Sequence, residues 1–177
     1  LRTTGFYHRQ QELGGYFLEA SGYERPHWYE CNKDLVAKYP TPARDEWSAR
    51  YWSPIIGAEA QYVRENVGLF DITALKRIEV TGKGSMEFLM EQTTGKLDKA
   101  PGSVTYCLMM TKDAGILSDV TVTRLAETHF MIGANSAIDV ARLKSAAPDT
   151  VHIKDVTAGT VGLGLFGPQA RKVVEKL

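Results

Sequence analysis

The stretch from Gly102 to Thr123 reads GSVTYCLMMTKDAGILSDVTVT, and it predicts a β-hairpin around which the rest of the fold can be arranged. Residues 104–110 are rich in β-branched, aromatic and long apolar side chains, and residues 116–123 have the composition of a return strand. Residues 112–115 supply the turn, because Gly115 can adopt a positive φ there.

One carboxylate on the return strand calls for an explanation. Successive side chains of a strand point to opposite faces. One face carries Ile116, Val120 and Val122, and the other carries Leu117, Asp119, Thr121 and Thr123. Strands are depleted in Asp, so Asp119 either faces solvent or a neighbouring loop, or it lines a pocket for a cationic or N–H-rich ligand. The pattern alone leaves both possibilities open.

Length and composition limit the class of protein. The 177 residues permit one ordinary domain or slightly more, and 44% hydrophobic with 24% charged residues is typical of a globular protein. The formal net charge is zero and no Lys/Arg cluster occurs, so we expect neither nucleic acid nor membrane as a partner. No apolar run approaches the roughly 18 residues that span a bilayer.

The sequence contains no metal or nucleophile motif. Cys31 and Cys107 are far apart, which argues against a disulfide framework and favours a reducing compartment. No metal site is expected, since the histidines are scattered over His8, His27, His129 and His152. There is no G-x-S-x-G elbow and no G-x-G-x-x-G fingerprint, so neither a serine hydrolase nor a dinucleotide fold is indicated within this chain.

The order of expected elements predicts the fold class. Helices are expected over residues 6–18 with a break at Gly14-Gly15, 55–67 ended by Gly68, 85–92 capped by Ser85, and 136–147 opened by a capping box of Ser136 and Asp139. Extended segments are expected over residues 23–29, 69–73, 76–81, 128–133, 151–156 and 160–166. Few helices connect successive strands, so we predict an α+β fold, mainly antiparallel sheet with flanking helices.

Residues 32–54 differ from their surroundings. They combine prolines and charges with the aromatic residues Tyr39, Trp47, Tyr51 and Trp52, and no periodicity persists. We interpret them as a surface insertion packed on its own domain, with a lid or a docking surface for another domain as the alternative. The chain starts at Leu1 and ends within an expected helix after Gly167-Pro168, so we expect a fragment of a longer protein.

Five sequence blocks occur in a fixed order along nearly all of the chain. They are His8–Gly15 with Ala20–Tyr29, Glu65–Thr73, Phe88–Leu89 with Thr93, Thr94 and Tyr106, Gly115–Val122, and Gly164–Ala170. Together they resemble the folate-dependent aminomethyltransferase family, the T-protein of glycine cleavage and its relatives. The resemblance implies that residues 1–177 are the N-terminal portion of a folate-binding domain. The remainder, with further acidic and basic partners, would lie beyond residue 177.

The insertion at residues 32–54 looks more like the folate domain of dimethylglycine and sarcosine dehydrogenases or oxidases. In that group FAD oxidises an amine, and the one-carbon unit then meets tetrahydrofolate to give 5,10-methylenetetrahydrofolate. The resemblance thus implies tetrahydrofolate as cofactor, FAD only through a missing N-terminal domain, and an FAD-dependent oxidoreductase domain in the same chain as partner. The location would be cytoplasmic in a bacterium or the mitochondrial matrix in a eukaryote.

Two alternatives remain open at this point. The first is a stand-alone aminomethyltransferase of the glycine cleavage system, whose partner is a lipoyl carrier protein. The second is a non-catalytic folate-binding regulatory module. The second arises because Ser118 replaces one acid of the family's Asp-Asp pair.

The resemblance also implies roles for individual residues. Asp119 matches the family's catalytic carboxylate, the second acid of the Asp-Asp pair. Tyr106 matches a tyrosine that lines the folate pocket, Leu75 an apolar wall residue, and Thr121 a position whose backbone contacts the pterin. A carboxylate beside the folate nitrogen could orient the reacting amine and accept or relay its proton. We therefore expect Asp119 to line a pocket.

Overall fold

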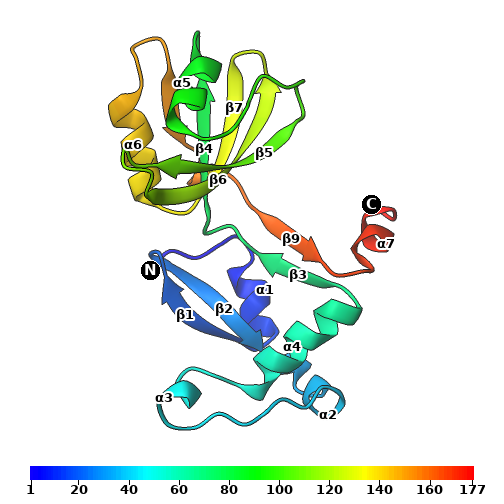
Figure 1. The fold of residues 1–177 in the computed structure, drawn as a ribbon. Helices are drawn as coiled ribbons and strands as arrows, with labels where there is room; N and C mark the ends of the chain where they lie inside the picture. The colour runs from blue at the N-terminus through cyan, green and yellow to red at the C-terminus, as the bar shows by residue number, and fades with distance from the viewer. The chain divides into compact units, whose positions relative to one another are not determined.

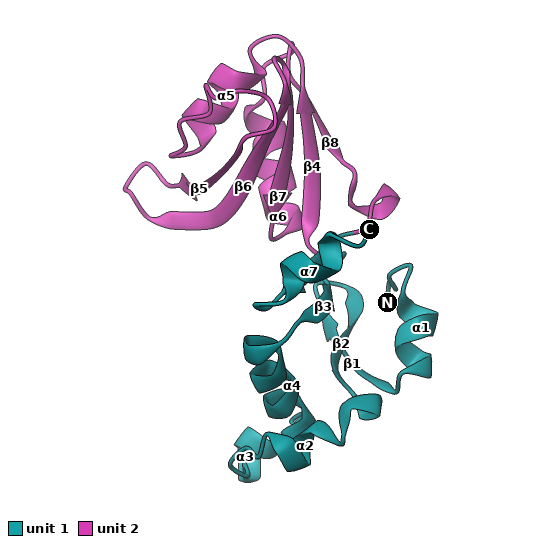
Figure 2. Cartoon of the chain, turned by 90° about the vertical axis from the view of Figure 1, so that its right-hand side faces the viewer, with its two compact units in different colours: residues 1–74, 162–177 teal, residues 75–161 magenta.

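The computed structural model describes all of residues 1–177, and the chain divides into two compact units (Figures 1 and 2). Unit 1 comprises Leu1–Ala74 and Gly162–Leu177, and unit 2 comprises Leu75–Val161. In the sequence, unit 2 is thus one continuous segment that separates the two parts of unit 1. The mixture of helices and antiparallel sheets confirms the α+β prediction.

Unit 2 is built on a five-stranded antiparallel sheet in the order β5-β6-β7-β4-β8. Its strands are β4 (Lys76–Thr81), β5 (Val104–Met110), β6 (Ile116–Ala126), β7 (His129–Ala134) and β8 (His152–Asp155). Its helices are α5 (Ser85–Gln92), α6 (Ala137–Ala146) and the 3-10 turn η2 (Thr157–Gly159). Every pair of neighbouring strands is antiparallel, as the hairpin-rich sequence predicts.

The core of unit 2 lies between one face of this sheet and the helices α5 and α6 (Figure 1). The side chains that are almost fully buried there include Phe130, Ile78, Leu89, Ile132 and Leu143. Each such burial contributes about 1.5–3 kcal/mol to folding. Because side chains alternate along each strand, the opposite face of the sheet carries the remaining residues and is open within this unit.

The predicted hairpin is β5–β6, with Tyr106 opposite Thr121 and Leu108 opposite Asp119. The positive φ in its turn belongs to Ala114, at 63°, and not to Gly115 as predicted. The reason is the hydrogen bonding of Gly115, whose carbonyl accepts from Thr111 N at 2.8 Å and whose N–H donates to Thr111 Oγ1 at 2.9 Å. Gly115 is therefore held by hydrogen bonds to Thr111 at the end of the hairpin turn, and the residue with the positive φ is Ala114, one position earlier.

Unit 1 contains two separate two-stranded sheets and the twelve-residue helix α4. The strands are β1 (Gly15–Ala20) paired with β2 (Tyr23–Tyr29), and β3 (Gly68–Asp71) paired with β9 (Leu163–Phe166). The helices are α1 (Tyr7–Glu12), η1 (Glu30–Asn32), α2 (Leu35–Lys38), α3 (Glu46–Ala49), α4 (Pro54–Glu65) and α7 (Ala170–Val174). No helix of either unit has both the length and the apolar composition to cross a membrane.

Local expectations in unit 1 need correction in two places. The helix predicted over residues 6–18 ends at Glu12, because Gly14 takes a φ of 72° and Gly15–Ala20 pairs as a strand with β2. Helix α4 ends at Glu65, and Gly68 opens strand β3 instead of capping the helix. β1 pairs with β2 across the two-residue turn Ser21-Gly22, and β3 pairs with the distant β9, so strand pairing outweighs the helical pattern in both places.

The two predicted caps of unit 2 differ in outcome. The capping box of Ser136 and Asp139 opens α6 as predicted. Ser85, however, is the first residue of α5, and the cap position belongs to Gly84 in a left-handed conformation with a φ of 84°. The Ser85 hydroxyl is buried and makes no hydrogen bond, so it does not serve as the predicted cap.

The insertion at residues 32–54 contains α2, α3 and irregular chain. Tyr39 is buried, and its hydroxyl donates to Glu65 of α4 at 2.7 Å, which ties the first part of the insertion to unit 1. Trp47 is 86% exposed at the other end. One aromatic residue thus packs on its own unit while another is presented to solvent.

Candidate active site

Three of the four residues singled out from the sequence lie together on the open face of the unit 2 sheet. Tyr106 and Thr121 are directly opposite each other on β5 and β6, and Asp119 is two residues before Thr121. The Tyr106 hydroxyl donates to Asp119 Oδ2 over a long 3.4 Å. Asp119 is exposed and Tyr106 is 65% exposed, so within this unit they lie on an open surface and not in a walled pocket.

The surroundings of Tyr106 change the pKa of its hydroxyl group. Its pKa is raised above the ordinary value of 10.0, first by reduced hydration and then by the negative charge of Asp119 and the hydrogen bond to it. Tyr106 therefore stays protonated at neutral pH, and it remains a donor toward the carboxylate.

Thr121 is paired on both sides, with Tyr106 of β5 and Gly133 of β7. Its backbone lies between two neighbouring strands, so its side chain is the group presented to the open face. A Cβ on Gly133 would lie 2.7 Å from Thr121 Oγ1, so the glycine leaves the space that this side chain needs. Leu75 is 38% exposed and immediately precedes β4, which β7 separates from β6.

Ser118 points away from the open face. It is buried, and its hydroxyl donates to Asp139 Oδ2 of α6 at 3.2 Å. Neighbouring residues of a strand alternate between faces, so the side chains of Ser118 and Asp119 leave the strand in opposite directions. The Ser118 hydroxyl also lies 3.3 Å from Asn135 Nδ2.

Asn135 is a contact of Asp119 that our sequence analysis missed. Its side-chain amide donates to Asp119 Oδ1 at 2.9 Å and to the Asp119 carbonyl oxygen at 2.9 Å. Asn135 follows β7, between the strand and the capping box of α6. No local pattern links this position to β6, so only the pairing of β6 with β7 reveals the contact.

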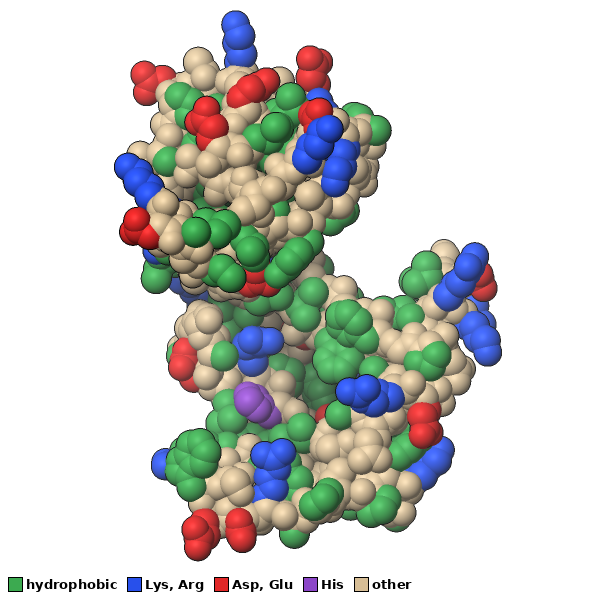
Figure 3. Space-filling view, in the orientation of Figure 1, with side chains coloured by type: hydrophobic (Ala, Val, Ile, Leu, Met, Phe, Trp, Pro, Cys, Tyr) green, Lys and Arg blue, Asp and Glu red, His purple; other side chains and the backbone are tan.

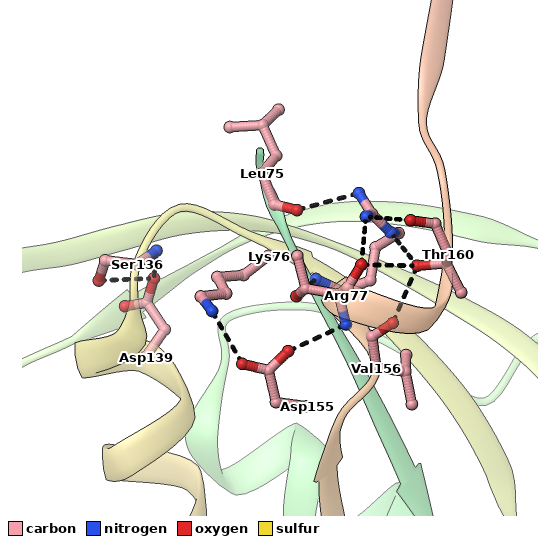
Figure 4. A network of polar contacts seen from close by, with 9 residues as sticks. Leu75, Lys76, Arg77, Ser136, Asp139, Asp155, Val156 and Thr160 are labelled. Atoms are coloured by element: carbon pink, nitrogen blue, oxygen red, sulfur yellow. Dashed lines mark hydrogen bonds and ion pairs between the residues drawn. The ribbon is translucent and has the colours of Figure 1, made fainter. Parts of the chain in front are cut away.

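Arg77 of β4 is opposite Gly133, which in turn is opposite Thr121, so its side chain lies on the open face of the sheet. The Arg77 guanidinium donates to the carbonyl oxygens of Leu75 at 3.0 Å, Thr157 at 3.0 Å and Thr160 at 3.1 Å (Figure 4). The backbone N–H of Arg77 also donates to Thr157 Oγ1 at 3.0 Å. Arg77 thereby ties the start of β4 to the turn that ends unit 2.

Unit 1 contains a hollow of about 790 Å³, lined by residues of β2, α4 and β3. Glu59 lies in its wall, where burial raises the pKa of the carboxyl group. Its Oε1 already accepts from Tyr29 N at 3.1 Å and Asn32 Nδ2 at 2.7 Å. Burial, helped by the charges of Asp71 and Glu59, raises the pKa of Tyr29 to about 12. The Glu59 carboxylate thus links elements of unit 1 to one another.

Asp71, a second acid of this hollow, is also occupied. Its oxygens accept from Thr4 Oγ1 at 2.5 Å, Gln10 Nε2 at 2.8 Å and Thr73 N at 3.0 Å. Burial alone would raise the pKa of Asp71, but these hydrogen bonds outweigh it and lower the pKa below 3.8. The two acids of this hollow are part-buried and hydrogen-bonded within unit 1, and Asp119 differs from them in being exposed.

Exposed hydrophobic side chains also gather on the paired strands β3 and β9, where Leu69, Phe70, Leu163 and Phe166 are 44–63% exposed. Acidic and basic side chains are interspersed with one another on the visible face of each unit (Figure 3). No group of three or more His, Cys, Asp and Glu side chains is arranged to hold a metal ion. Asp119 and its neighbours are therefore the candidate that combines exposure with converging polar groups.

The fold and this face define a class: an α+β protein that presents a carboxylate from the open face of an antiparallel sheet. The family model described as the GCVT N-terminal domain matches residues 6–177, so the chain belongs to this family of aminomethyltransferase-like domains. The glycine cleavage aminomethyltransferase T of Bartonella henselae has a similar solved structure. Its TM-score is 0.77 at 27% identity, over 99% of this chain and 43% of that one.

Two further relatives are enzymes of different kinds, an oxidase and an aminomethyltransferase. The chain is 29% identical to a formaldehyde-forming 4-methylaminobutanoate oxidase of Paenarthrobacter nicotinovorans, over 100% of this chain and 21% of the oxidase. It is 36% identical to an aminomethyltransferase of Geobacillus thermodenitrificans, over 69% of this chain and 34% of that protein. The chain thus spans between a fifth and about a third of the length of these two relatives.

Proposed function

We propose that this chain supplies the first half of a tetrahydrofolate-binding one-carbon transfer domain. The whole protein would be a flavoprotein that oxidatively demethylates dimethylglycine or sarcosine and forms 5,10-methylenetetrahydrofolate. The observation that carries the proposal is the Asp119 carboxylate, exposed beside Tyr106 on the open sheet face of a family member.

The residues of the open face suit a reduced folate. An exposed tyrosine ring offers a stacking surface, and a carboxylate accepts from the N–H groups of a pterin ring. Tetrahydrofolate would supply a nucleophilic nitrogen. Asp119 would orient that nitrogen and accept or relay its proton, while its charge would stabilise positive charge that develops on the one-carbon unit. The remaining walls of the pocket would come from sequence beyond residue 177.

The flavoprotein context has its own support. The match to the 4-methylaminobutanoate oxidase extends over the entire chain, but the similarity to the Bartonella T-protein also covers 99% of it, so the support comes from the reaction in the oxidase's name. That relative is named as an enzyme that forms formaldehyde from a methylated amine, which is the kind of one-carbon unit the proposed domain would capture. FAD would belong to a separate oxidoreductase domain of the same chain.

The second candidate is a stand-alone aminomethyltransferase of glycine cleavage. It is favoured by the 36% identity to the Geobacillus aminomethyltransferase and by the similarity to the Bartonella T-protein. Its one-carbon donor would be an aminomethyl group on a lipoyl carrier protein. Turnover of that carrier without oxidation of a free amine would select this candidate over the flavoprotein.

The experiment is Asp119→Asn in the full-length enzyme. Formation of 5,10-methylenetetrahydrofolate from tetrahydrofolate and the amine should fall roughly 100- to 10,000-fold, because the group that accepts the proton is lost. Oxidation of the amine, followed with an artificial electron acceptor, should stay close to the wild-type rate, because it would take place in a different domain.

Asp113→Asn is the matched control, since it removes an exposed carboxylate from the turn of the same hairpin. This variant should keep both activities. An unchanged yield of 5,10-methylenetetrahydrofolate in Asp119→Asn would refute the catalytic role of Asp119.

A further inference from the structure

We propose that Asn135 is a positioning residue that holds the Asp119 carboxylate in one orientation on the open sheet face. This inference rests on the function proposed above, because the orientation matters only if Asp119 handles a proton of the substrate. It assigns a task to a residue that lies outside the strands of the hairpin.

The side-chain amide of Asn135 donates two hydrogen bonds to Asp119. Its Nδ2 lies 2.9 Å from the carboxylate oxygen Oδ1 and 2.9 Å from the carbonyl oxygen of the same residue. One contact fixes the side chain and the other fixes the backbone from which it projects. A donor that bridges both atoms restricts the rotation of the Asp119 side chain about the Cα–Cβ bond.

The direction of the Asn135 amide follows from its acceptors. A backbone carbonyl oxygen can only accept a hydrogen bond, so the amino end of the Asn135 side chain has to face Asp119. The same Nδ2 lies 3.3 Å from Ser118 Oγ, which is a further acceptor on that side. The amide oxygen is thereby directed away from the carboxylate.

The backbone of Asn135 is anchored by the start of α6. The N–H of Asn135 donates to Asp139 Oδ2 at 3.2 Å, and the N–H of Ser136 donates to the same oxygen at 3.0 Å. Asp139 is 2% exposed, and it also accepts from the Ser118 hydroxyl. The capping box therefore does more than open the helix, since it places the residue that orients Asp119.

No other contact of the Asp119 side chain could replace the hydrogen bonds from Asn135. The Tyr106 hydroxyl reaches Oδ2 at only 3.4 Å, which is long for an O–H donor to a carboxylate. Asp119 is exposed, and an exposed strand aspartate without a close donor has several rotamers available. Loss of the Asn135 amide should therefore release the carboxylate.

The direct test compares crystal structures of the full-length protein as wild type, Asn135→Ala and Asn135→Asp. We expect a single Asp119 rotamer in the wild type and displaced or multiple rotamers in both variants. Asn135→Asp keeps the size of the side chain but replaces the donor by an acceptor. An unchanged single rotamer of Asp119 in both variants would overturn the inference.

The kinetic test separates positioning from a merely structural role. The kcat for methylene transfer should fall roughly 10- to 100-fold in Asn135→Ala, because a hydrogen bond to a charged group is lost. The KM for tetrahydrofolate should change less than kcat, because Asp119 would supply only one of the contacts to the pterin, whereas the proton transfer would depend on its orientation directly. In an Asp119→Asn background, Asn135→Ala should cause no further loss, since both changes remove the same contribution.

The control is Asn32→Ala, which removes another amide–carboxylate hydrogen bond, to Glu59 at 2.7 Å in unit 1. It should leave kcat unchanged. If Asp119→Asn has no effect on transfer, the proposed function fails, while the crystal structures still decide whether Asn135 orients Asp119. If Asp119→Asn is inactive but Asn135→Ala keeps the wild-type kcat, the positioning role alone is rejected.

Discussion

Ser118 and Asp119 are neighbours in the sequence, yet at the scale of single residues they serve different parts of unit 2. Ser118 contributes to the buried contact with Asp139, and Asp119 lies on the open face. The alternation of a strand accounts for this difference. The two side chains nevertheless share one hydrogen-bond partner, because Asn135 Nδ2 lies 3.3 Å from the Ser118 hydroxyl and 2.9 Å from Asp119 Oδ1.

Asp155 allows a prediction on stability and pH. Partial burial would raise its pKa, but the Lys76 ammonium at 2.8 Å, with the Thr157 hydroxyl and N–H, lowers the pKa to about 2 (Figure 4). The folded-state pKa lies below the ordinary value of 3.8, so the ionised form stabilises the fold above about pH 4. That contribution is lost as the pH falls toward 2.

We expect Asp155→Asn to lower the free energy of unfolding by about 1 kcal/mol at pH 7, a value reduced for solvent screening because the side chain is 32% exposed. The difference from wild type should shrink between pH 4 and pH 2. Urea unfolding at several pH values measures it, with Asp149→Asn at an exposed position as the control. A difference independent of pH would contradict the role of the ionised carboxylate.

At the scale of elements, the turn between β4 and α5 contains two glycines with different tasks. Gly82 has a φ of 113°, and a Cβ there would lie 2.1 Å from the carbonyl oxygen of Thr150, just before β8. Gly84 has a φ of 84°, and a Cβ there would meet nothing within 4 Å. Only the first glycine is required for the close approach of two chain segments.

Gly82→Ala should therefore lower the free energy of unfolding by about 3 kcal/mol or more, because backbone strain and a backbone clash add. Gly84→Ala should lose only about 1 kcal/mol, the cost of a left-handed alanine. Thermal or urea unfolding of the two variants side by side measures the difference. Equal losses would show that the contact with Thr150 does not limit the turn.

The start of the chain shows where local patterns fail at this scale. Phe6, Leu13, Tyr16 and Phe17 have helical spacing, yet Gly15–Ala20 forms a strand. The strand is stabilised by pairing with Tyr23–Tyr29 and by the stacking of Tyr16 on Trp28 at 4.0 Å between ring centroids. The partner strand follows after the two-residue turn Ser21-Gly22, whose residues both have a positive φ, so a local hairpin replaces the predicted helix.

At the scale of the whole molecule, the chain comprises two units and spans only part of the length of its relatives. The candidate site lies on a sheet face that unit 2 itself does not cover, with Tyr106 65% exposed. Reduced folates need a concave, largely enclosed site for tight binding. Residues 1–177 present Asp119 and Tyr106 on an exposed surface.

We predict weak or no affinity of residues 1–177 for tetrahydrofolate, in contrast to the full-length protein. Calorimetric titration of both with the same reduced folate tests this, and circular dichroism of the shorter chain checks that it is folded. A micromolar dissociation constant for the shorter chain would show that the missing walls are not needed.

The amino-acid sequence by itself determined the α+β class, the central hairpin, the alternation that separates Asp119 from the core, and the capping box of α6. These features depend on contacts between residues that are close in the chain. Tertiary structure alone decided that Gly68 opens a strand paired with β9, that Ser118 meets Asp139, and that Asn135 reaches Asp119. Each of these depends on strand pairing or on a helix packed against the sheet, and such distant contacts leave no local periodicity in the sequence.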